Sequence, residues 1–111
     1  MEAAKRTYSQ KKIDELLKAV LMIGNLKEAR MFFRDLCTLD ELKSMSERWE
    51  IATLLSRGLS YRKVAEDLNV STTTVSRVAS WLYNGKGGYA SVIKKVIKTS
   101  HSHSLRSRRK S

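Results

Sequence analysis

Apolar residues recur at helical spacing along most of the chain, and no stretch shows the pattern of a strand. The repeats predict helices over about residues 9–22, 25–36, 38–57, 60–68, 72–83 and 89–98, and the chain contains no proline to interrupt them. Thr38 and Glu41 have the spacing of a capping box at the start of the third helix. We therefore expect one all-α domain over residues 9–98, preceded by a flexible N-terminus over 1–8. Residues 99–111 are too polar to pack and are predicted to form a disordered basic tail.

Residues 61–80 predict two short amphipathic helices joined by a tight turn, within a helix-turn-helix at about 60–83. Asn69 occupies the turn, where a residue tolerant of left-handed backbone is favoured, and Ser71 can cap the second helix. The inward faces consist of Val64, Ala65, Leu68, Val75 and Val78. Hydroxyl and basic side chains are left for the outer face, as in a helix that lies in a DNA major groove.

Eight residues of this segment are predicted to contact DNA. The hydroxyls and methyls at the start of the second helix suit base edges, and the N-terminal end of the first helix is placed to touch phosphate. Ser71 is better interpreted as a cap, and for Lys63 a solvated basic face is an equally good interpretation. The predicted DNA-binding residues are Tyr61, Arg62, Lys63, Ser71, Thr72, Thr73, Ser76 and Arg77.

The net charge of the chain and its distribution favour a nucleic acid as the partner. The formal net charge is +11 and the sequence pI about 10.1, and from Leu68 onward there are nine Lys and Arg residues but no acid. Acidic side chains in a groove-facing helix would be repelled by phosphates, so their absence favours DNA binding. The arginines and lysine near the C-terminus are expected to add salt-sensitive, non-specific affinity.

Other function classes find little support. The chain has no nucleophile–base arrangement and no metal cluster, and the His101/His103 pair is a weak site, so we expect neither an enzyme nor a bound metal. Cys37 is the single cysteine, which fits a reducing compartment and predicts a small buried hydrophobe. No signal peptide or membrane span is evident, which predicts a cytoplasmic, nucleoid-associated protein.

Three stretches resemble the Trp-repressor superfamily, most closely its YerC/YecD branch. They read FFRDLCTLDE (residues 32–41), SERWEIATLLSRGLSYRKVAEDLNVSTTTVSRV (46–78) and LYNGKGGY (82–89). The resemblance implies a Trp-repressor-like, intertwined homodimer whose N-terminal helices form a shared core. Its two recognition helices would meet successive major grooves of double-stranded DNA about 34 Å apart. We accordingly expect a sequence-specific transcriptional regulator, most simply a repressor. A non-specific architectural or replication-associated DNA binder and a helical protein–protein adaptor remain alternatives.

The resemblance also implies an effector pocket built from Thr38, Arg48 and Arg77. Two departures bear on the ligand, because Val78 and Trp81 stand where the Trp repressor has a small glycine and a serine. Their bulk would fill the space for an indole, so we expect no tryptophan cofactor, while another small-molecule corepressor is left open. Arg77 would then contact phosphate or base, and Arg48 would pair with an acid such as Glu47 or Glu50, or with a helix end. Trp49 and Trp81 are expected in the core or the dimer interface.

Overall fold

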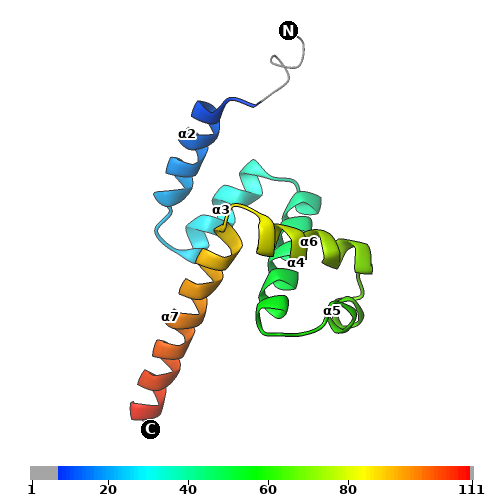
Figure 1. Ribbon diagram of the computed structural model, residues 1–111. Helices are drawn as coiled ribbons and strands as arrows, with labels where there is room; N and C mark the ends of the chain where they lie inside the picture. Colours follow the sequence, from blue (N-terminus) through cyan, green and yellow to red (C-terminus); the bar gives the residue numbers. More distant parts are fainter. Residues whose placement is uncertain (1–7, 111) are drawn as a thin grey trace. The chain divides into compact units, whose positions relative to one another are not determined.

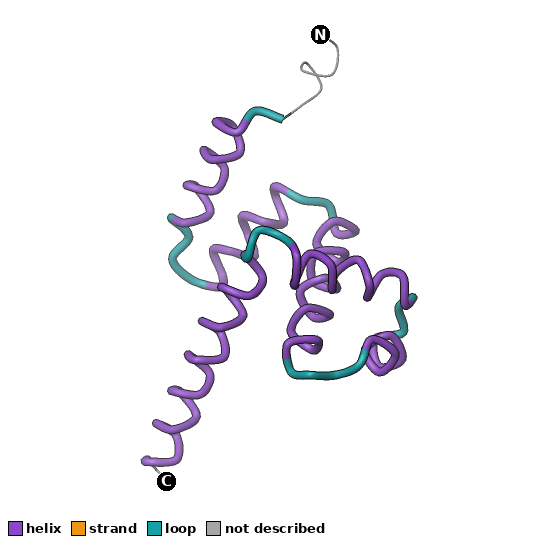
Figure 2. Tube along the Cα trace, viewed as in Figure 1, coloured by secondary structure: helices purple, strands orange, loops and turns teal. Residues whose placement is uncertain are grey.

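The computed structural model describes residues 8–110, with side chains as far as Thr99, and all regular structure in that range is helical (Figures 1 and 2). This confirms the predicted all-α class. The predicted flexible N-terminus lies outside the described residues except for Tyr8. In chain order the helices are α2 (Gln10–Leu21), α3 (Leu26–Leu36), α4 (Leu39–Ser56), α5 (Tyr61–Leu68), α6 (Thr72–Asn84) and α7 (Gly88–Lys110).

Side-chain caps define most of the helix starts. The Asn25 side chain accepts a hydrogen bond from the backbone N–H of Glu28 at 2.8 Å, which starts α3. The capping box is confirmed, because the Thr38 N–H donates to Glu41 Oε1 at 2.8 Å and the Glu41 N–H donates to Thr38 Oγ1 at 3.1 Å. These bonds satisfy amides that the first helical turn leaves without partners.

The chain divides into two compact units, and the boundary follows Leu42 in the first turns of α4. The first unit contains α2 and α3, neither of which contributes a buried residue. The rings of Phe32 and Phe33 make an edge-to-face contact, with their centroids 5.5 Å apart. Cys37, at the end of α3, is half-buried, whereas the sequence predicted a buried position. The apolar faces of both helices are therefore largely open to solvent, with Leu21 77% exposed.

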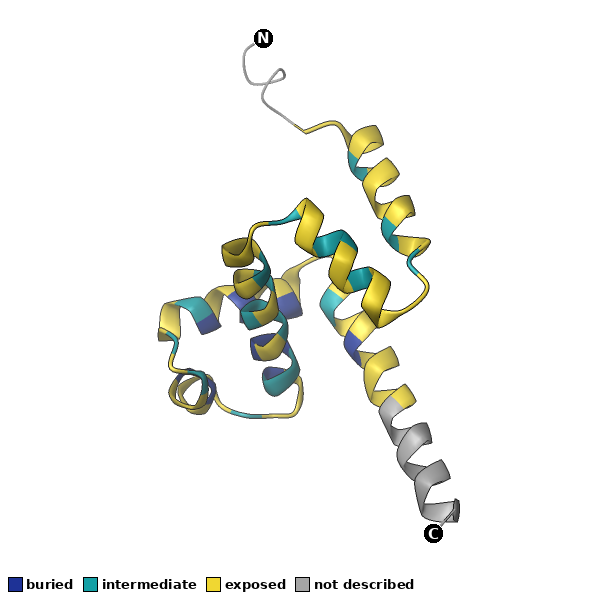
Figure 3. Ribbon diagram, turned by 180° about the vertical axis from the view of Figure 1, so that it is seen from behind, coloured by how far each residue is buried: buried dark blue, intermediate teal, exposed yellow. Residues whose placement is uncertain are grey.

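The second unit, from Lys43 onward, holds the hydrophobic core (Figure 3). Helices α4, α5, α6 and α7 all contribute to it, and α6 packs against both α5 and α7. The predicted inward positions on α5 and α6 are confirmed, except that Leu68 is half-buried. The buried residues are Ile51, Ala52, Leu55, Val64, Ala65, Val75, Val78, Ala79, Leu82 and Ile93.

The last helix differs from the sequence-based expectation. Its end was predicted near Lys98, before a disordered tail, whereas α7 continues to Lys110. No glycine or proline follows Gly88, so nothing in the local chemistry interrupts the backbone hydrogen bonds of the helix. Within residues 8–110, no helix combines the length and the apolar character needed to cross a membrane.

Candidate nucleic-acid interface

The turn between α5 and α6 has the predicted geometry. Asn69 adopts left-handed backbone angles, φ 54° and ψ 49°, which an asparagine tolerates better than most residues. The N–H of Val70 donates to the Ala65 carbonyl at 3.1 Å, and Val70 packs partly against the core. This closing bond and the apolar contact are those of a Schellman-type helix end. The turn thus directs the chain from α5 into α6.

Ser71 begins α6 as its N-cap. Its Oγ accepts the N–H of Thr74 at 3.0 Å and lies 2.9 Å from the Thr74 hydroxyl. The predicted capping role is confirmed. Because this hydroxyl already has partners, Ser71 is less available for a base edge than its neighbours are.

The outer face of α6 carries the predicted contact residues. Thr72, Thr73, Ser76 and Arg77 are exposed, while Val75, Val78 and Ala79 on the opposite face are buried in the core. Among the side chains described, from residue 8 to 99, no hydrogen bond or ion pair engages any of the four exposed residues. The helix therefore presents free hydroxyls and one guanidinium to solvent on a rigidly packed support.

The basic side chains of α5 have acidic partners. Arg62 Nε lies 3.8 Å from Glu66 Oε2, and Lys63 Nζ lies 3.1 Å from Asp67 Oδ1. All four side chains are exposed, as is Tyr61 at the start of the helix. Exposed ion pairs of this kind contribute only about 0–1 kcal/mol to stability. Neither acid is among the residues predicted from the sequence to contact DNA. Each lies four residues after its cation, however, and this spacing predicts an ion pair on a helix.

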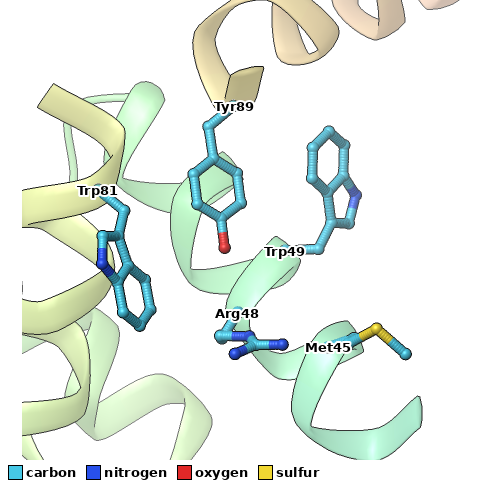
Figure 4. Close-up of a pocket in the computed structure, with 5 residues that line it drawn as sticks. All are labelled: Met45, Arg48, Trp49, Trp81 and Tyr89. Atoms are coloured by element: carbon cyan, nitrogen blue, oxygen red, sulfur yellow. The ribbon is translucent and has the colours of Figure 1, made fainter. Parts of the chain in front are cut away.

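A shallow pocket of about 400 Å³ lies in the second unit (Figure 4). Helix α4 contributes Met45, Arg48 and Trp49, α6 contributes Trp81, and α7 contributes Tyr89. The rings of Trp49 and Tyr89 stack, with their centroids 6.5 Å apart and an interplanar angle of 24°. Figure 4 shows that Arg48, Trp81 and Tyr89 face the same space from three different helices.

Only part of the predicted effector site lies at this pocket. Arg48 lines it, whereas Arg77 is exposed and is not a lining residue. Thr38 belongs to the first unit, where it caps α4. The expected pairing of Arg48 with Glu47 or Glu50 is absent among the described side chains, and no hydrogen bond to a helix end is recorded for Arg48 in that range.

The two predicted pocket-filling residues have different environments. Val78 is 1% exposed and belongs to the core, so its bulk is used for packing. Trp81 lines the pocket and is 47% exposed, so the expectation of a core position is wrong for it within the single chain. Trp49 is half-buried and packs against the core, as expected. A dimer-interface position for Trp81 stays a prediction.

Comparisons with known proteins agree with this architecture. The family model described as Trp repressor protein matches residues 11–97. The uncharacterized protein YerC of Bacillus subtilis strain 168 is 36% identical over 89 residues, which are 80% of this chain and 86% of YerC. The crystal structure of a TrpR-like protein from Eubacterium eligens ATCC 27750 has a TM-score of 0.73 and 37% identity, covering 78% of this chain and 89% of that one. A candidate Trp repressor from Staphylococcus aureus also has a TM-score of 0.73, at 32% identity, covering 86% and 94%.

Proposed function

The chain belongs to the Trp repressor protein family, whose members are DNA-binding regulators and not enzymes, and from that premise we propose that it is a sequence-specific transcriptional repressor. Helix α6 would enter the major groove of double-stranded DNA, and α5 would lie across the phosphate backbone. The protein would act in the cytoplasm, on the nucleoid.

One observation carries this proposal. Thr72, Thr73, Ser76 and Arg77 form an exposed, acid-free strip on α6 without partners among the described side chains, directly opposite the buried Val75 and Val78. Threonine offers a hydroxyl and a methyl to base edges, and an arginine can reach a guanine or a phosphate. The core on the inner side of α6 supports a fixed orientation of these groups, which base discrimination requires.

The assembly we propose is a homodimer. Large apolar side chains of the first unit are exposed in the single chain, among them Leu17, Leu21, Met22, Leu26 and Met31. Apolar helix faces that are open to solvent in the single chain are typical of a protein interface. A second copy of the chain would cover these faces and would place two α6 helices for two half-sites.

No cofactor is required by this proposal. An effector, if one regulates binding, would enter the pocket beside Arg48 and Trp81, although Thr38 and Arg77 are not among its lining residues. The indole of Trp81 already occupies its rim, which disfavours free tryptophan as the ligand.

The proposal is tested by measuring dissociation constants for a duplex that the purified protein enriches from a randomised library. Thr73→Ala should weaken binding to that duplex about fivefold to tenfold and relax selection at one base pair, because a base contact is lost. Arg62→Ala should weaken binding to the enriched duplex and reduce the salt slope of that binding by about one, because a phosphate contact is lost. Thr99→Ala, an exposed threonine change on α7, is the matched control and should leave both quantities unchanged.

The rival functions give different results. Equal affinity for every sequence would favour a non-specific architectural binder, and failure to bind any duplex would favour a protein–protein adaptor. Either outcome would overturn the proposal.

A further inference from the structure

The outer face of α5 is electrically neutral, although the helix directly precedes the acid-free, basic part of the chain. Arg62 is paired with Glu66 and Lys63 with Asp67, each across one helical turn. These two carboxylates are the only acidic residues after Glu50. Every charged residue that follows α5 in the sequence is cationic, so α5 is the last helix of the chain with acidic residues.

The four charged side chains share one surface. Val64 and Ala65 are buried in the core, which leaves residues 62, 63, 66 and 67 on the solvent side of α5. Side chains four residues apart on a helix are neighbours, so a phosphate that approaches either cation also meets a carboxylate. The carboxylates oppose that approach, and the long-range attraction of α5 for DNA is cancelled.

We propose that Glu66 and Asp67 are specificity-determining residues, which prevent α5 from binding phosphate unless α6 fits the groove. The inference rests on the proposed function and concerns how the same interface discriminates between sequences. In a non-specific complex, attraction between cations and phosphates supplies nearly all the affinity, and a neutral α5 contributes little of it. In a matched complex, the base contacts of α6 hold α5 against the backbone, and Arg62 and Lys63 exchange their carboxylates for phosphate oxygens. Exposed ion pairs are weak, so this exchange is readily made.

The test uses the full chain with Glu66→Gln, Asp67→Asn and both together, since the amides keep the size of the side chains and remove only charge. Glu50→Gln is the matched control, because Glu50 is an exposed glutamate on α4 for which no ion pair is recorded among the described side chains. Binding is measured over a range of salt concentrations for a random-sequence duplex and for the duplex that the wild type enriches. Thermal unfolding of each variant reports whether the fold is kept.

The double variant should bind the random duplex about tenfold tighter at low salt, with a salt slope steeper by about one to two. Its affinity for the enriched duplex should rise about threefold at most, so the ratio between the two affinities falls. Arg62→Ala combined with Glu66→Gln should cancel the gain that Glu66→Gln gives alone. The Glu50→Gln protein should match the wild type for both duplexes.

Equal gains on both duplexes, or no gain on the random duplex, would overturn the inference. If the wild type enriches one sequence and the variants keep the wild-type ratio of affinities for the enriched and random duplexes, this inference is contradicted but the proposed function is not. A wild-type protein that enriches no sequence contradicts the proposed function and, with it, the role assigned to the two acids.

Discussion

The ammonium Nζ of Lys63 lies 3.1 Å from the carboxylate Oδ1 of Asp67, one turn further along α5. A lysine expected to face phosphate thus has a local partner in the free protein. With the pair between Arg62 and Glu66, this contact neutralises the cations of α5. Arg77 on α6 has no acidic partner among the side chains described over residues 8–99. This distribution of charge favours our proposal that α6 discriminates between DNA sequences while α5 has a supporting role.

The two possible roles of Ser71 can be separated by substitution. Ser71→Ala should lower the free energy of unfolding by about 1 kcal/mol, because the Thr74 N–H loses its acceptor. Ser71→Asp should keep the cap and the stability, while the added negative charge at the groove-facing end of α6 weakens DNA binding at least tenfold. Urea unfolding and duplex titration of both variants measure the two effects. A Ser71→Asp protein that binds DNA like the wild type would place this end of α6 away from the phosphates.

The loop between α6 and α7 depends on one glycine. A Cβ at Gly85 would lie 2.3 Å from the Trp81 carbonyl oxygen, so Gly85→Ala requires backbone movement at the end of α6. We expect a destabilisation of about 1–3 kcal/mol. Gly88→Ala is the matched control, because no atom lies within 4 Å of its Cβ and its φ is not left-handed. Thermal unfolding of the two variants should differ clearly, and equal unfolding temperatures would contradict the described path of this loop.

The apolar face of α2 should be needed for assembly. Leu21 is largely exposed in the single chain, and Leu21→Glu should shift the protein from dimer to monomer by placing a charge in the subunit interface. Ala19→Glu adds the same charge at an exposed position on another side of α2 and should leave the dimer intact. Sedimentation velocity of both variants gives the result. A Leu21→Glu protein that stays dimeric would show that the two copies associate through a different surface.

Free tryptophan should leave DNA affinity unchanged. The Trp81 ring lines the pocket beside Arg48, and Val78 is packed in the core, so neither position provides the space of a glycine or a serine. Duplex titrations with and without saturating L-tryptophan test this, with Trp81→Ser as the variant that opens the rim. Tighter binding of the wild type in the presence of tryptophan would contradict our interpretation of this pocket.

The local structure of the helix-turn-helix could be predicted from the sequence, because short-range chemistry determines it. Asn69 and Ser71 each act within one turn of the backbone, and the capping box at Thr38 spans four residues. The apolar spacing on α5 and α6 likewise identified the faces that pack together. Such features depend on residues adjacent in sequence, so no knowledge of tertiary structure was required.

The site was less predictable where it depends on distant or paired groups. The pocket brings Tyr89 of α7 to Trp49 of α4, and no local pattern indicates this stack. The exposure of Trp81 depends on how α6 lies on its neighbours, which helical periodicity alone did not resolve. The residues predicted to contact DNA include only groups that attract it. Glu66 and Asp67 are not among them, because their negative charges oppose DNA binding.

Sequence-specific recognition by α6 is tested most directly by selection from a randomised duplex library with the purified wild-type protein, followed by sequencing of the bound fragments. A dimer that reads DNA through two α6 helices should enrich one motif with two-fold symmetry, its half-sites centred about one helical turn apart. Bound fragments with the same sequence distribution as the starting library would contradict sequence-specific regulation by this protein.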